Sequence, residues 1–352
     1  MLKLKGLATG IGSLPHKDAK AALDLIFKYI PEIPFWPQLP KRDIREGMVA
    51  QFSQNFPFLK MKEDGLHFEP FDAKEGELEL FYERVIARDL DYFKISEGFA
   101  LGLHEFYQRL KETDLKRIEI IKCQITGPFT FTASLKDKNG IPVLHDAVFL
   151  QAVLKGLSMK ALWQVDFFKG FGKKIIIFID EPYLGCFGSA YTPINREDVV
   201  RVLRELSEEI KSEGKKLSSE DVLIGVHCCG NTDWSMLMEV EGIDIISFDA
   251  FDFLDNFVLY ADNLKDFLQK KKIICWGIVP TQEFSGKENP NLLIKRIKQA
   301  VDILEKKGLE KDLLLENLLI SPACGLGTLD TENSERILKL LAETASSIKK
   351  SL

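Results

Sequence analysis

Residues 174–182 read KIIIFIDEP, and residues 222–231 read VLIGVHCCGN. Each is a short and almost wholly apolar run that ends in polar residues. Between them lies NREDVVRVLRELSEEIKSEG, in which the apolar side chains Val199, Val200, Val202, Leu203 and Leu206 fall on one face at helical spacing. Apolar strands that alternate with helices are typical of a parallel sheet buried on both faces.

The same pattern recurs along the whole chain. Six further runs of this kind are KGLATGIGS (5–13), EIPFWPQLP (32–40), IEIIKCQITGP (118–128), IDIISFDAF (243–251), KIICWGIVPT (272–281) and LLISPACGLGT (318–328). Eight strand–helix units in 352 residues predict an α/β protein, a single (β/α)8 TIM barrel that spans residues 1–352.

The chain has more residues than eight strand–helix units need, and most of the additional residues follow the second run, in residues 41–117. We expect an insertion there, with a hairpin and helices that lie over the mouth of the barrel. An open, doubly wound sheet is the alternative fold, but no GxGxxG motif follows the first run, which disfavours it.

Composition excludes several classes of function. The formal charge of -6 and the mixing of Lys with Glu give no general attraction to nucleic acid or to an anionic membrane. The first residues, MLKLKGLATG, lack the apolar core of a signal peptide, and no apolar run is long enough to cross a bilayer. We therefore expect a soluble, cytoplasmic protein that binds neither nucleic acid nor membrane.

The chemically distinctive residues all lie at the C-terminal ends of the eight runs. Examples are Ser13, Asp180, His227, Asp249 and Cys324. In a barrel these ends form a single rim, which is where active sites of this fold are built. The placement predicts an enzyme.

A metal site is predicted at this rim. His227 and Cys229 are two residues apart on a strand, so both can point into the barrel mouth while Cys228 faces the helices. Cys324 ends the eighth run and can approach them across the mouth. One histidine and two thiolates suit zinc, with a fourth position open. The alternative is that the two cysteines and the histidine are ordinary core residues.

The charge of such a site indicates its chemistry. Two thiolates nearly neutralise a zinc ion, which makes it a poor generator of hydroxide. It can still bind a substrate thiol and lower the pKa of that thiol below its usual value of about 8.5. We therefore expect alkyl transfer to sulfur rather than hydrolysis.

Several motifs resemble the C-terminal catalytic barrel of cobalamin-independent methionine synthase. Ile11-Gly12-Ser13 is similar to that family's first-strand IGS, which implies that these residues hold the homocysteine carboxylate. ITGPFTFT (125–132) resembles its TGPVT stretch. Asp180 in IDEP (179–182) matches its DEP aspartate and is implied to contact the substrate. Locally, Asp180-Glu181-Pro182 also fits a helix N-cap.

The metal motifs resemble the same family. His227, Cys229 and Cys324 match its zinc ligands, and Asp249 lies on the strand that carries the family's glutamate ligand. The resemblance therefore implies Asp249 as a fourth ligand or as an acid beside the metal. HCCGNT is also similar to the HxCGNT of the methylcobamide:coenzyme M methyltransferases, which share the uroporphyrinogen decarboxylase barrel.

Two departures from the methionine synthases concern the substrates. The chain has no room for the N-terminal barrel that helps to bind folate, so we predict a methylated corrinoid, methylcobalamin or a corrinoid protein, as the methyl donor. Arg42 stands where the family has a glutamate for the homocysteine ammonium. Either Glu46, Asp180 or Glu181 binds that ammonium, or Arg42 binds an anionic group of a different thiol.

These observations predict a zinc-dependent methyltransferase that converts homocysteine to methionine. Asp180 and Asp249 are its predicted catalytic acids, and the substrate is held by Ile11, Gly12, Ser13, Arg42, Asp180 and Glu181. The alternatives are a coenzyme M methyltransferase, a decarboxylase-like lyase, and a barrel that binds a corrinoid or a thiol without turnover. The lyase is disfavoured because residues 1–30 contain no arginine to bind propionates.

Overall fold

A parallel, curled sheet of seven strands forms the centre of the molecule. The computed structural model describes residues 4–69, 75–189, 192 and 194–351. The strand order in the sheet is β1-β9-β8-β7-β6-β5-β4, and each neighbouring pair is parallel. The strands coincide with seven of the eight predicted runs: β1 (Leu7–Ala8), β4 (Ile120–Thr126), β5 (Lys174–Asp180), β6 (Val222–Cys228), β7 (Ile245–Phe248), β8 (Ile273–Val279) and β9 (Leu318–Pro322).

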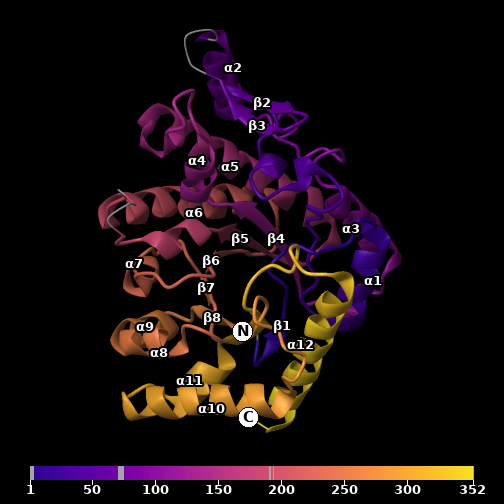
Figure 1. The fold of residues 1–352 in the computed structure, drawn as a ribbon, viewed down its shortest axis with the longest axis vertical. Helices are drawn as coiled ribbons and strands as arrows, with labels where there is room; N and C mark the ends of the chain where they lie inside the picture. The colour runs from indigo at the N-terminus through magenta and orange to yellow at the C-terminus, as the bar shows by residue number, and fades with distance from the viewer. Residues whose placement is uncertain (1–3, 70–74, 190–191, 193, 352) are drawn as a thin grey trace.

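Helices surround this sheet (Figure 1). This arrangement confirms an α/β fold and is consistent with a TIM-like barrel. The helices are α1 (Ala19–Tyr29), α2 (Glu75–Ile86), α3 (Leu101–Glu112), α4 (Pro128–Ser134), α5 (Ala147–Phe168), α6 (Arg196–Leu217), α7 (Trp234–Met238), α8 (Leu254–Phe257), α9 (Ala261–Gln269), α10 (Pro290–Lys306), α11 (Lys311–Glu316) and α12 (Thr331–Ser351). No helix in the described part of the chain is both long and apolar enough to cross a membrane.

The second predicted run does not form a strand. Residues 32–40 make only isolated bridges, from Phe35 to Lys122 on β4 and from Gln38 to Ser13 after β1. Pro34 and Pro37 lie inside this run, and proline has no N–H to donate to a ladder. The segment thus lies between β1 and β4 without regular pairing to either strand.

The segment 41–117 contains a hairpin and the helices α2 and α3, and its placement as an insertion over the mouth of the barrel stays a prediction. The hairpin consists of β2 (Leu59–Lys62) and β3 (Gly65–Phe68), and it projects with α2 beyond α4 and α5 (Figure 1). Phe68 of the hairpin packs edge to face against Phe149 of α5. The start of this segment, with the short helical turn η1 (Ile44–Glu46), reaches the cavity described below.

Side chains alternate across the strands between two apolar clusters. On β6, Val226 and Cys228 belong to the large cluster between sheet and helices. The inner face of the sheet has a smaller cluster, which includes Ile120, Phe178 and Cys275. His227 therefore points inward, because it lies between two outward residues on the same strand.

Candidate metal and acceptor site

A cavity of about 480 Å³ opens at the C-terminal ends of the strands. Its walls come from several strand ends, as the sequence predicted for this rim. The residues that line it are Ile11, Ser13, Gln38, Pro40, Lys41, Glu46, Met48, Asp180, Pro182, His227, Cys229, Thr281, Gln282, Cys324, Gly325, Gly327 and Thr328.

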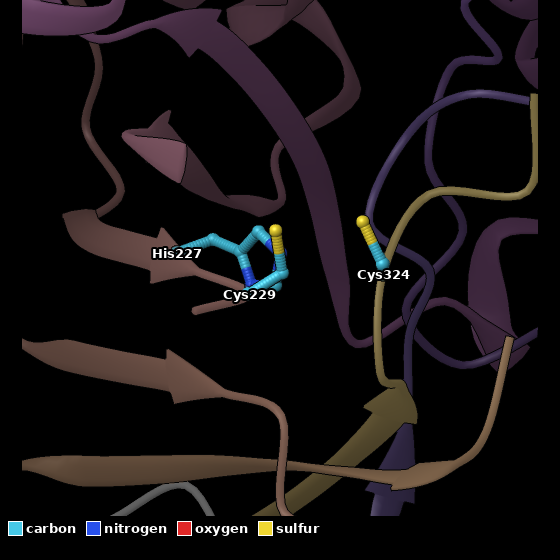
Figure 2. Close-up of side chains that lie close together, drawn as sticks. All are labelled: His227, Cys229 and Cys324. Carbon is cyan, nitrogen blue, oxygen red and sulfur yellow. The ribbon is translucent and has the colours of Figure 1, made fainter. Parts of the chain in front are cut away.

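The three predicted metal ligands meet in this cavity. The ligand atoms of His227, Cys229 and Cys324 all lie within 4.8 Å of one another. His227 and Cys229 come from the end of β6, and Cys324 approaches from the loop after β9 on the other side (Figure 2). Cys228 is fully buried on the helix side of the sheet. The alternation predicted for His227, Cys228 and Cys229 is confirmed.

His227 has the hydrogen bonding of a metal ligand. Its Nδ1 lies 3.0 Å from Oγ of Ser247 on the neighbouring strand β7, where the two residues are paired in register. Its Nε2 is buried and has no hydrogen-bond partner among the described residues. With Nδ1 donating to Ser247, Nε2 presents its lone pair to the two thiols. These donors fit a zinc ion, which takes nitrogen and sulfur ligands in such sets.

The two thiols influence each other's ionisation. Cys229 lies beside Cys324 and donates a hydrogen bond to its thiolate, so the pKa of Cys324 is lowered. The pKa of Cys229 is raised, because its own ionisation would place a second negative charge next to Cys324 in a buried site. A divalent cation would compensate both charges.

Asp180 contributes a carboxylate to the same cavity. It ends β5 in register with His227 on β6, and it is 5% exposed. Its Oδ1 is buried without a hydrogen-bond partner among the described residues. Burial raises the pKa of Asp180 to about 6, and the positive charges of Lys122 and His227 oppose that shift. Such an oxygen is available to a cationic or donor group of a ligand.

Glu46, and not Arg42, lines the cavity. The Glu46 carboxylate accepts hydrogen bonds from Nε of Arg42 at 2.5 Å, from the backbone N–H of Leu39 at 3.0 Å and from that of Leu101 at 3.3 Å. Burial raises the pKa of Glu46, and the Arg42 guanidinium opposes this. Arg42 is thus the ion-pair partner of a cavity acid and is not itself part of the wall.

Glu181 points away from the cavity. Its carboxylate accepts hydrogen bonds from the backbone N–H groups of Phe129 and Thr130, each at 2.9 Å, and from the Thr130 hydroxyl at 2.6 Å. Glu181 therefore caps the first turn of α4, where a carboxylate is stabilised by the free N–H groups of the helix. Burial raises the pKa of Glu181 to about 7, and these hydrogen bonds oppose the shift.

Asp249 does not join the three ligands. Its Oδ1 accepts hydrogen bonds from the N–H groups of Phe251 at 2.9 Å and Asp252 at 3.0 Å, in the turn after β7. Burial raises the pKa of Asp249 to about 6. The structure gives Asp249 a role in this turn, and its action as a fourth ligand or acid stays a prediction.

Ile11 and Ser13 line the cavity, whereas Gly12 between them does not. Oγ of Ser13 accepts a hydrogen bond from the N–H of Gly327 at 3.1 Å. A Cβ at Gly12 would lie 2.9 Å from Oε1 of Gln38, and a Cβ at Gly325 would lie 2.3 Å from Oγ of Ser13. The glycines of IGS and CGLG therefore allow two loops and Gln38 to pack closely around the cavity.

Sequence reasoning missed several lining residues. Lys41 and Met48 come from irregular chain after the second run, and Gln282 and Thr328 lie beyond strand ends. Glu46 was considered only as one of three alternative acids. The sequence feature that could have pointed to Glu46 is Arg42, because the two residues are four positions apart and of opposite charge.

Comparison with known proteins gives a family and a fold. Residues 108–347, more than half of the chain, match the family model described as cobalamin-independent synthase, catalytic domain. A B12-independent methionine synthase from Shewanella sp. W3-18-1, solved in complex with selenomethionine, is similar with a TM-score of 0.58 and 15% identity. That match covers 99% of this chain and 98% of the other. No curated protein matches the chain significantly.

A second solved structure has the same fold. It is a methyltransferase from Methanosarcina mazei, with a TM-score of 0.53, 12% identity, and coverage of 94% of this chain and 84% of the other. The comparisons give no support to the corrinoid donor or the corrinoid-protein partner predicted from the sequence. The matched family is described as independent of cobalamin.

Proposed function

Since the chain belongs to the cobalamin-independent synthase catalytic-domain family and is a methyltransferase of the methionine synthase type, we propose that it methylates homocysteine with the help of zinc. The observation that carries this proposal is one cavity that holds both a soft-metal donor set and two carboxylates. The donor set is His227, Cys229 and Cys324, and the carboxylates belong to Asp180 and Glu46.

His227, Cys229 and Cys324 would hold the zinc ion. When bound, zinc lowers the pKa of an acceptor thiol so that the sulfur is nucleophilic near neutral pH. Ser247 fixes the ring of His227 through Nδ1 and thereby keeps Nε2 directed at the two sulfurs.

The remaining residues of the cavity select and orient the acceptor. Asp180, with its unpartnered Oδ1, and Glu46 supply negative charge for an ammonium group. Ser13 and Lys41 supply hydrogen-bond donors and a positive charge for a carboxylate on the facing wall. Ile11, Met48 and Pro182 line the space between them with apolar groups, which exclude water from the sulfur. An α-amino acid with a short thiol side chain matches this distribution of charge.

Coenzyme M is the competing acceptor. It carries a sulfonate and no ammonium, so it would leave Oδ1 of Asp180 without a hydrogen-bond partner in a buried site. Arg42 would be the residue to recognise a sulfonate, but its guanidinium is already paired with Glu46. The charges of the cavity therefore favour homocysteine.

The test combines metal analysis with an acceptor and donor screen. Zinc per chain is measured by mass spectrometry, and the zinc-loaded protein is incubated with homocysteine or coenzyme M. Methylcobalamin and 5-methyltetrahydrofolate are supplied in separate reactions, which identifies the donor. We expect zinc-dependent formation of methionine. Full activity without metal, or preferential methylation of coenzyme M, would contradict the proposal.

A further inference from the structure

Lys122 is a fully buried lysine beneath the cavity, on the inner face of β4. Its Nζ donates hydrogen bonds to the backbone carbonyl of Ile11 and, at 3.0 Å, to Oε1 of Gln124. Nζ also lies 5.0 Å from the centre of the Phe178 ring. No ion pair with a carboxylate is found for Lys122 among the described residues. Burying an ammonium in this way is costly, so its position calls for a function.

One edge of β4, on which Lys122 lies, pairs regularly with β5, but the other edge has no regular strand beside it. The chain between β1 and β4 is the proline-containing segment 32–40, which makes only isolated bridges. Side chains bind its free carbonyl groups instead. Nε2 of Gln124 donates to the carbonyl of Trp36 at 3.1 Å, and the Thr9 hydroxyl donates to that of Ile33 at 3.0 Å.

The hydrogen bonds of Lys122 and Gln124 connect these two residues to the wall of the cavity. Ile11, which accepts from Lys122, lines the cavity together with Ser13 and Gln38. The backbone of Gln38 exchanges hydrogen bonds with Gly12 and Leu14 on either side of Ser13. Lys122 thus binds one end of the wall segment 11–14, and through Gln124 it is linked to the chain that pairs with the other end.

We propose that Lys122 is a positioning residue for the acceptor wall of the cavity. Its ammonium fixes the Ile11 carbonyl, and so reinforces the placement of Ser13 and Gln38, which are joined by one isolated bridge and not by a regular strand. A charged donor suits this task because hydrogen bonds from an ionised group are stronger than those between neutral groups. The part of this inference that concerns acceptor binding rests on the proposed function, whereas the part that concerns the wall does not.

Lys160 on α5 provides a matched control. It is also fully buried, and it also lies near a ring and a carbonyl, with Nζ 5.8 Å from the centre of Phe56 and 3.5 Å from the oxygen of Phe93. Neither of these partners lines the cavity. Replacing either lysine by methionine removes a buried charge and keeps a side chain of similar length. Only Lys122→Met removes a contact to the cavity wall.

The experiment compares the wild type with Lys122→Met and Lys160→Met. Hydrogen exchange measured by mass spectrometry should become faster in residues 9–14 and 33–39 of Lys122→Met and stay unchanged in residues 222–229. The KM for homocysteine should rise by about 10-fold or more, which corresponds to the loss of one charge-assisted hydrogen bond, while kcat changes much less and zinc per chain stays the same. Lys160→Met should show none of these local changes.

The outcomes separate this inference from the proposed function. If the wild type forms no methionine, the proposed function fails, and hydrogen exchange alone decides the role of Lys122. If the wild type is active and Lys122→Met keeps its exchange pattern and its KM, the inference is overturned. Equal effects of Lys160→Met would also overturn it. If Lys122→Met does not fold, Lys122→Gln replaces it, with a side chain that is one bond shorter and uncharged. It should show the same changes to a smaller extent. Wild-type behaviour of the folded Lys122→Gln would overturn the inference too.

Discussion

The two sides of the cavity are built in different ways. On the metal side, His227 lies on β6 and Cys229 directly follows its last residue, and β6 is paired in register with β5 and β7 on both of its edges. On the acceptor side, the segment 32–40 has isolated bridges, and the carbonyl groups of Ile33 and Trp36 are bound by the side chains of Thr9 and Gln124. Regular pairing determines where a side chain points from its position in the strand. Irregular chain requires a specific side-chain contact for each group.

The largest effect should come from the metal side. Cys229→Ala or Cys324→Ala removes one of three donor atoms, so we expect zinc per chain to fall to near zero. Methyl transfer should fall by more than about 100-fold, since loss of a residue that merely supports a ligand already costs about 10- to 100-fold. Zinc analysis and the rate of methionine formation measure both. Cys228→Ala is the matched control, because Cys228 faces the helices and should leave zinc and rate unchanged. Loss of zinc in that control would show that strand alternation does not decide ligation.

A smaller effect on the same side should come from Ser247→Ala. This change removes the partner of His227 Nδ1 and leaves the three donor atoms in place. We expect zinc affinity to weaken by about 10- to 100-fold, as found for residues that orient metal ligands. Competition with a zinc chelator measures it. An unchanged affinity would mean that the pairing of β6 with β7 alone holds the ring.

How far the site was predictable from sequence follows the same division. His227, Cys229 and Cys324 were identified because they end regular runs. The same alternation places Glu181 outward once Asp180 points inward, but Glu181 is among the predicted site residues because Arg42 stands where the family has a glutamate for the ammonium. A strand was also predicted for residues 32–40, from their apolar content. Pro34 and Pro37 in this run were the signal against a strand. Glu46 and Lys41 could not be placed, because irregular chain has no periodicity from which to infer direction.

The acceptor side is tested by Glu46→Gln. The change keeps the size of the side chain and removes its negative charge, so the ammonium of homocysteine loses a partner, and Arg42 is left with an uncompensated charge beside the cavity. We expect the KM for homocysteine to rise by about 10-fold, the worth of one hydrogen bond to a charged group. Zinc per chain should not change.

The control for this variant is an acceptor without the ammonium. 4-Mercaptobutyrate has the thiol and the carboxylate of homocysteine but no amino group. Glu46→Gln should raise the KM for homocysteine and leave the KM for 4-mercaptobutyrate unchanged. If both acceptors lose equally, Glu46 acts only by holding Leu39 and Leu101 through their N–H groups, and Asp180 alone would have to recognise the ammonium.

The smallest effect on catalysis is expected from Lys160→Met, which should change the stability of the protein instead. Lys160 lies one helical turn before Gln164, which binds Trp36 and Gln124 in the buried network, and burial lowers the pKa of Lys160 to about 7. Its ordinary pKa is 10.5.

Below pH 7 both the folded and the unfolded chain carry the proton on Lys160, so the folded state bears the full cost of the buried charge. Between pH 7 and 10.5 the unfolded chain binds more protons, so the free energy of unfolding rises with pH relative to a variant without this group. Urea denaturation should therefore find Lys160→Met more stable than the wild type by about 4 kcal/mol near pH 7 and by no more than about 1 kcal/mol near pH 10. Lys298→Met, at an exposed position on α10, should show no such trend. A difference that is independent of pH would mean that Lys160→Met acts through packing, and its value as a control for Lys122 would then rest on hydrogen exchange alone.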